Sequence, residues 1–129
     1  MSHTSRFVGI DISKSSFDIC ILPERQVATF ANTAEGICAF IALMADLTGI
    51  ERLIIEPTGG YERGVVDALL AAYLPVAKVN AKQVRQFARA CGQLSKTDRI
   101  DAFVLADYGR RMESKVLAPR SPGQTLPVD

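Results

Sequence analysis

Two apolar runs near the start of the chain, separated by a carboxylate and a short polar turn, constrain the fold most strongly. In the first run, apolar side chains recur at every second position, which is typical of a β-strand: Val8, Ile10 and Ile12. A charge within a core is costly, but at the end of a central strand it can meet a metal or a substrate in the crevice where open α/β sheets bind ligands. Asp11 is therefore the first candidate functional residue.

The rest of the chain alternates between strand and helix signals. A third strand at 26–30 would complete an antiparallel meander, and a helix is predicted between Thr33 and Gly49. The remaining predicted elements are a strand at 53–55, a helix carrying apolar residues 65–73, a strand at 75–79, a helix at 81–91, and a last helix that a capping box at 95–98 opens and that runs to about residue 112. This order predicts an α/β domain with a mixed five-stranded sheet and helices on both faces.

Acidic residues stand at three separate points of this order. Glu56 ends the strand at 53–55, because Pro57 cannot continue a ladder. A right-handed crossover would place that strand parallel to, and next to, the strand of Asp11. If the last helix packs over the sheet with its start at the same end, Asp98 and Asp101 join Asp11 and Glu56.

Four such carboxylates would need protons or cations. At about 6 Å and an effective dielectric of about 20, each like-charge pair costs about 3 kcal/mol. Hard oxygen ligands suit Mg²⁺ or Mn²⁺, which can support phosphodiester chemistry. Each residue also has a purely structural explanation: Asp11 as a turn residue, Asp98 as a helix cap, and Asp101 as an ion-pair partner of Arg99 or Lys96.

Basic residues are concentrated in the second half of the chain, although the net charge is only +1. Between residues 78 and 115 there are nine Lys and Arg against four Asp and Glu. On the predicted helix at 81–91, Lys82, Arg85 and Arg89 form one stripe, which is either a solvated face or a surface for phosphates.

Composition limits the alternatives. A chain of 129 residues that is 48% hydrophobic suits one domain, which we expect at 1–115, followed by a linker or disordered tail at 116–129. No run is long enough to span a membrane and no signal peptide is evident, so a cytoplasmic location without a membrane partner is expected. Cys20, Cys38 and Cys91 show no metal-binding or disulfide spacing, and we expect all three in the core.

Three segments, in this order, resemble the amino-terminal domain of the DEDD insertion-sequence transposases, relatives of the Piv site-specific invertase. The segments are 9–14 (GIDISK), 55–62 (IEPTGGYE) and 96–102 (KTDRIDA). The resemblance implies a RuvC-like, RNase H-like fold with Asp11, Glu56, Asp98 and Asp101 as the catalytic, metal-binding tetrad. It also implies DNA strand cleavage and rejoining, guided in some members by a bridge RNA, and a homo-oligomer in the full-length protein.

The family pattern continues into a second domain with a nucleophilic serine, which is absent here, so a fragment is expected. In this light the basic stripe, together with Lys96 and Arg99, would flank the acidic crevice and neutralise phosphates, and Lys14 is a further phosphate candidate.

Two alternatives stay open at this point. An actin-like sugar kinase or ATPase also opens with a strand, Gly-x-Asp, a polar turn and a second strand. A non-catalytic nucleic-acid-binding module would keep the carboxylates for structural reasons.

Overall fold

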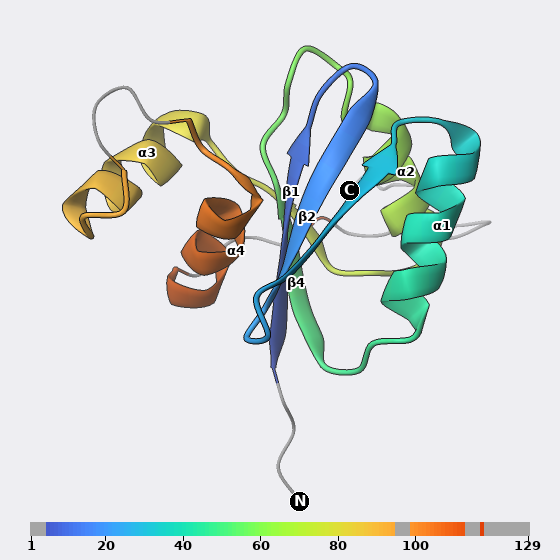
Figure 1. Cartoon of the computed structure of the whole chain (residues 1–129), viewed down its shortest axis with the longest axis horizontal. Helices are drawn as coiled ribbons and strands as arrows, with labels where there is room; N and C mark the ends of the chain where they lie inside the picture. The colour runs from blue at the N-terminus through green and yellow to red at the C-terminus, as the bar shows by residue number, and fades with distance from the viewer. Residues whose placement is uncertain (1–4, 95–98, 113–116, 118–129) are drawn as a thin grey trace, which may run out of the picture.

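A single five-stranded sheet forms the centre of the computed structural model, which describes residues 5–94, 99–112 and 117 (Figure 1). Its strands lie in the order β3-β2-β1-β4-β5. Their bounds are β1 Arg6–Ile12, β2 Ser16–Leu22, β3 Gln26–Ala31, β4 Ile50–Ile55 and β5 Val76–Lys78. The strands β1, β2 and β3 form an antiparallel meander, and β4 and β5 join β1 in parallel. The predicted α/β class, the mixed sheet and the crossover beside Asp11 are therefore confirmed.

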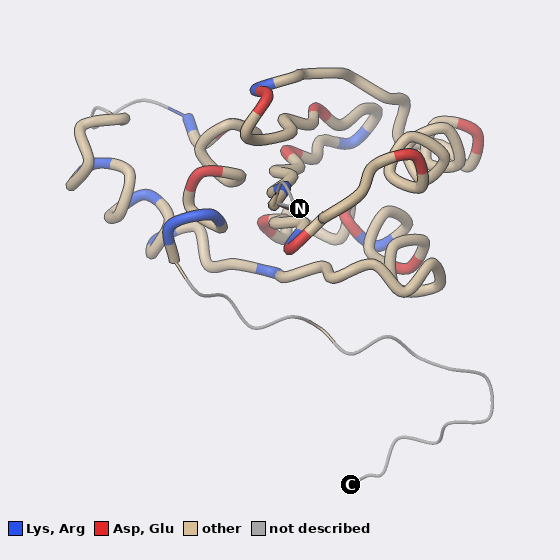
Figure 2. The backbone as a smooth tube through the Cα atoms, turned by 90° about the horizontal axis from the view of Figure 1, so that it is seen from below, with Lys and Arg blue, Asp and Glu red and all other residues tan. Residues whose placement is uncertain are grey.

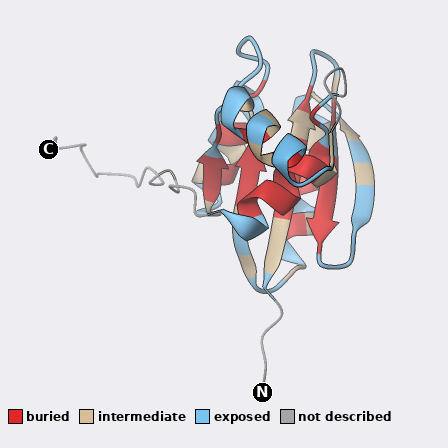
Figure 3. Ribbon diagram, turned by 90° about the vertical axis from the view of Figure 1, so that its left-hand side faces the viewer, coloured by how far each residue is buried: buried red, intermediate tan, exposed pale blue. Residues whose placement is uncertain are grey.

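Helices cover both faces of the sheet, as predicted. In Figure 1, α1 (Ala34–Ala45) and α2 (Arg63–Ala71) lie on one face, and α3 (Ala81–Ala90) and α4 (Ala102–Arg111) lie on the other. Alternate residues of a strand point to opposite faces of the sheet and so contribute to two separate hydrophobic cores. Val8, Ile10 and Ile55 belong to the core under α1 and α2, whereas Ile54 belongs to the core under α3 and α4. Figure 3 shows the resulting buried layer along the central strands.

The last helix begins later than predicted. It starts at Ala102, and Asp101 caps it by accepting a hydrogen bond from the Val104 N–H at 2.9 Å. The described residues that precede it, Arg99 to Asp101, are not helical, so the prediction of one helix from the 95–98 capping box was wrong. Asp101 has the extended backbone of an N-cap residue, and its side chain accepts from the third N–H of the helix, which fixes the start of α4 at Ala102. Residues 95–98 themselves lie outside the described part of the chain.

Glycine lets α4 approach the sheet closely. A Cβ atom on Gly9 of β1 would collide with the backbone carbonyl oxygen of Ala102 and the backbone nitrogen of Ala106. Within α4 itself, a Cβ atom on Gly109 would collide with the side chain of Ile54 in β4. The position of α4, and of Asp101 at its start, therefore depends on these two residues without side chains.

The cysteine prediction was partly wrong. Cys20 is buried under α4, but Cys38 and Cys91 are exposed. Cys38 lines an open groove between α1 and α2, and Cys91 is the C-cap residue of α3. Periodicity alone did not show which of the apolar positions face outward.

Two further observations concern the last described residue and the expectation that no segment spans a membrane. Leu117 donates its N–H to the carbonyl of Val76 at 2.8 Å and packs against the core, so the chain touches the edge strand β5 there. Of the predicted tail at 116–129, Leu117 is the one residue that the structure describes. In the part of the chain that the structure describes, no helix is long and apolar enough to cross a membrane.

Candidate acidic active site

Asp11 and Glu56 meet at one edge of the sheet. Ile10 of β1 pairs with Ile55 of the parallel strand β4, so the next residue of each strand, Asp11 and Glu56, leaves the ladder at the same end. Both carboxylates line one cavity of about 210 Å³. Arg85 of α3 and Arg99 before α4 line the same cavity.

Asp11 is held in a half-buried position beside one cation. Arg99 Nη2 lies 2.6 Å from Asp11 Oδ2, and 15% of the Asp11 side chain is exposed against 73% of the Arg99 side chain. Burial raises the pKa of Asp11 above its ordinary value, although the hydrogen bond and the charge of Arg99 oppose that rise. The negative charges of Asp18 and Asp101 add to the rise.

The pKa of Glu56 is also raised above its ordinary value. Burial raises its pKa, and the nearby Asp11 carboxylate raises it further, against the attraction of Arg85 and Arg99. Desolvation therefore destabilises the ionised forms of both strand-end carboxylates, and the charge of Asp11 adds to this effect at Glu56.

The loops that follow these carboxylates are tied together. The Asn32 side-chain amide donates to the carbonyl oxygens of Ser13, after β1, and of Tyr61, after β4, at 3.1 and 3.0 Å. The buried Glu62 accepts from the Thr58 N–H at 2.9 Å. Sequence reasoning did not single out Asn32, and its signal, a polar residue between a strand and a helix cap, is too common to identify it.

The other two predicted acids stand differently. Asp101 caps α4 and lines two neighbouring cavities rather than the one shared by Asp11 and Glu56, yet its charge acts on Asp11. Asp98 lies outside the described residues. Among the described residues no group of three or more His, Cys, Asp or Glu side chains is placed to hold a metal ion.

The two converging carboxylates nevertheless suit a divalent cation. Asp11 and Glu56 offer hard oxygen donors from two neighbouring strand ends, and burial raises the pKa of each carboxyl group. A cation would relieve the repulsion between them, as Arg99 does in part at Asp11.

The predicted phosphate-binding residues surround this edge unevenly. Arg85 and Arg99 line the cavity itself, whereas Lys82 and Arg89 are exposed on α3 and Lys14 is exposed in the β1–β2 turn. Figure 2 shows basic residues spaced along α3. Lys96 lies outside the described residues.

Sequence reasoning missed two basic residues near the site. Lys78, at the end of β5, lines a second cavity with Glu56 and the start of α3. Its signal was available, since β5 is parallel to β4 and ends at the same edge. Arg25 of the β2–β3 turn lines a cavity that Asp101 and Arg99 also line, and no sequence signal indicated this.

A model of a transposase family matches residues 8–126, which include almost the whole described fold and all three motif segments. The chain belongs to the DEDD transposase family of the IS110 type. Two pilin gene-inverting proteins are similar to this chain over 96% of its length, at 33% identity in Moraxella lacunata and 32% in Moraxella bovis. The chain spans 39% of the length of each of these relatives.

Solved structures of RuvC from Thermus thermophilus share the fold. The structure of RuvC in complex with a Holliday junction substrate aligns with this chain at a TM-score of 0.60 and 16% identity. The alignment covers 88% of this chain and 100% of the RuvC chain. A second RuvC structure aligns at a TM-score of 0.58 and 17% identity, and that alignment covers 87% of this chain and 99% of the RuvC chain. The RuvC-like, RNase H-like fold that the resemblance implied is confirmed, and the family match favours a transposase over a sugar kinase.

Proposed function

We propose that this chain is the metal-binding catalytic domain of a DNA recombinase that cleaves and rejoins DNA strands. The observation that carries the proposal is the meeting of Asp11 and Glu56 in one cavity with Arg85 and Arg99. Membership in a transposase family and the relation to gene-inverting proteins support DNA as the substrate.

The chemistry follows from the kinds of side chain at this edge. Asp11 and Glu56 would hold a divalent cation, Mg²⁺ or Mn²⁺, with Asp101 and Asp98 completing the set. When bound, such an ion polarises a phosphodiester and stabilises an oxygen leaving group. Arg85 and Arg99 would orient the scissile phosphate by charge-assisted hydrogen bonds, while Lys14, Lys82, Arg89 and Lys96 would contact flanking phosphates.

The test compares matched carboxylate substitutions. Millimolar Mn²⁺ or Mg²⁺ is expected to raise the melting temperature of the wild-type chain, and Asp11→Asn and Glu56→Gln are each expected to abolish that rise. Asp67→Asn, which removes an exposed carboxylate on α2, is the control and should keep the full rise. An equal metal response in all four proteins would refute the metal site.

A second candidate function is a non-catalytic nucleic-acid-binding module, which the basic residues along α3 favour. DNA binding that survives replacement of Asp11, Glu56, Asp98 and Asp101 together, with no metal response in the wild type, would support it. Loss of the metal response on replacement would support the catalytic domain.

The wider setting of the proposal concerns the full-length protein. We expect it to act on DNA in the cytoplasm as a homo-oligomer, since rejoining requires several strands to be held at once. A guide RNA is also proposed, and co-purification of a discrete RNA species with the full-length protein is the measurement that tests it.

A further inference from the structure

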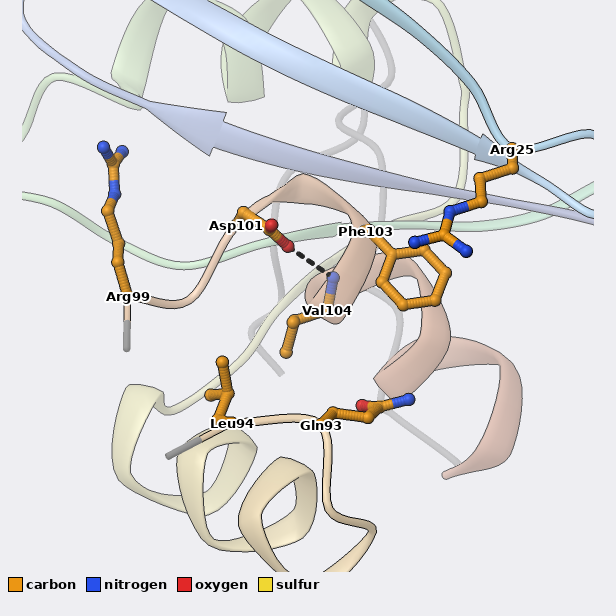
Figure 4. A pocket seen from close by; sticks show the side chains of 7 residues that line it. All are labelled: Arg25, Gln93, Leu94, Arg99, Asp101, Phe103 and Val104. Atoms are coloured by element: carbon orange, nitrogen blue, oxygen red, sulfur yellow. Dashed lines mark hydrogen bonds between the residues drawn. The ribbon is translucent and has the colours of Figure 1, made fainter. Parts of the chain in front are cut away.

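A cavity of about 480 Å³ lies beside the acidic edge, between the β2–β3 turn, the loop after α3 and the start of α4. Figure 4 shows Arg25 and Arg99 on opposite sides of it, with Asp101 and Phe103 between them. Its volume falls within the range of small-ligand sites, about 300–1,000 Å³, and so suits a nucleotide unit rather than a duplex.

Arg25 has three properties of a binding group. Its guanidinium lies over the Phe103 ring, 4.0 Å from the centroid. Its backbone has a φ of 62°, which is strained for a residue with a Cβ atom. Among the described residues, no carboxylate forms an ion pair with it. Asp101 lines the same cavity, but its Oδ1 accepts the Val104 N–H.

The cavity and the Asp11–Glu56 site share one lining residue. Arg99 lines both, and the charge of Asp101 acts on Asp11. The β2–β3 turn lies at the end of β1 opposite to Asp11, since Leu22 pairs with Phe7, and the cavity lies between Arg25 of that turn and Arg99. A strand with a phosphate at Asp11 and Glu56 would therefore run past Arg99 and Asp101 to reach Arg25.

We infer that this cavity is a subsite for the DNA strand next to the cleavage position, in which Arg25 binds a flanking phosphate. The inference rests on the proposed function. The ring of Phe103 holds the guanidinium by its face, which leaves the N–H groups along the edge of the fork to donate to phosphate oxygens. The contact with the ring already restricts the Arg25 side chain, so less side-chain entropy is lost on binding.

The experiment measures the affinity of the chain for a short, fluorescein-labelled single-stranded DNA by anisotropy, with Mg²⁺, over a series of salt concentrations. Arg25→Gly removes the guanidinium and also relieves the positive φ, so it should fold at least as well as the wild type. We expect its Kd to rise about fivefold to tenfold and its salt slope to fall by about 0.7, the value for one phosphate contact to a single strand.

Two controls separate the subsite from the metal site. Arg63→Ala removes an exposed arginine at the start of α2, on the other face of the sheet, and should leave the affinity unchanged. Phe103→Leu keeps an apolar side chain but removes the ring, and should weaken binding less than Arg25→Gly does.

The outcomes distinguish the two proposals. Wild-type affinity and salt slope in Arg25→Gly, with an intact metal-induced rise in melting temperature, would overturn the subsite and leave the catalytic domain standing. A wild-type chain with neither DNA binding nor a metal response would overturn both.

Discussion

Arg99 Nη2 lies 2.6 Å from Asp11 Oδ2, although the two residues stand 88 positions apart in the chain. The ion pair joins the first strand of the sheet to the segment just before α4. It places a guanidinium against the carboxylate oxygen that a metal ion would use. Arg99 is therefore both a phosphate candidate and an internal counter-ion for the acidic edge.

Removing this counter-ion should strengthen metal binding. In Arg99→Gln the Asp11 carboxylate no longer has its arginine partner, so we expect the apparent Kd for Mn²⁺ to fall about threefold to tenfold, and DNA affinity to fall as well. Isothermal titration with Mn²⁺ measures the first effect. Arg89→Gln, on the exposed side of α3, is the matched control, and equal Mn²⁺ affinity in Arg99→Gln and the wild type would contradict the expectation.

Glu56 should reduce stability at neutral pH. Because its pKa is raised, chiefly by burial and then by Asp11, the folded chain holds this proton more tightly than the unfolded chain. The protonated Glu56 side chain therefore stabilises the folded chain below the ordinary pKa of 4.5, and this contribution is lost as the pH rises through the raised pKa of the folded state. Without metal, Glu56→Gln is thus expected to raise the melting temperature by about 3 °C at pH 7. At about pH 3, where Glu56 is protonated in both states, we expect no change in the melting temperature. Thermal denaturation at both pH values checks this, and an equal gain at both would contradict it.

Asp107 should show the opposite pH dependence. It is fully buried, and burial favours its protonated form, but hydrogen bonds from Gln93, Arg110 and Arg111 outweigh burial and lower its pKa. Its contribution to stability is present above the ordinary pKa of 3.8 and is lost as the pH falls through the lower, folded value. Asp107→Ala is expected to cost about 2–3 kcal/mol at pH 7, since it breaks a buried hydrogen-bonded charge.

The check is urea denaturation of Asp107→Ala and the wild type at pH 7 and at pH 2.5. We expect the difference in unfolding free energy to shrink at the lower pH, and a difference that stays constant would argue against an ionised Asp107 in the fold.

Gly9→Ala should displace α4 from the sheet. The added methyl group would meet the backbone of Ala102 and Ala106, which cannot move as a flexible side chain can. We expect a loss of about 3 kcal/mol or more, with a weaker metal response because Asp101 shifts with the helix. Circular dichroism melts and the Mn²⁺ titration measure both effects. Gly59→Ala, which meets only a tyrosine side chain but has a positive φ, gives the cost of backbone strain without a steric collision.

Much of the fold and the centre of the site could be predicted from local patterns. Alternation in β1, the apolar run of β4 and the proline after Glu56 identify two strands that each end in an acid. The handedness of crossovers then places these strands side by side, because a right-twisted strand followed by a helix packs back onto the sheet in only one way. The meeting of Asp11 and Glu56 follows from sequence for this reason.

Other relationships depend on contacts that no local pattern encodes. The exposure of Cys38 and Cys91, the ion pair of Arg99 with Asp11 and the stacking of Arg25 on Phe103 each depend on elements that are distant in the chain. Periodicity and capping residues specify which elements form, because those depend on neighbours along the backbone. Only packing of α4 against β1 through Gly9 decided which charged side chains share a cavity, because that distance is set by the surfaces of two elements together.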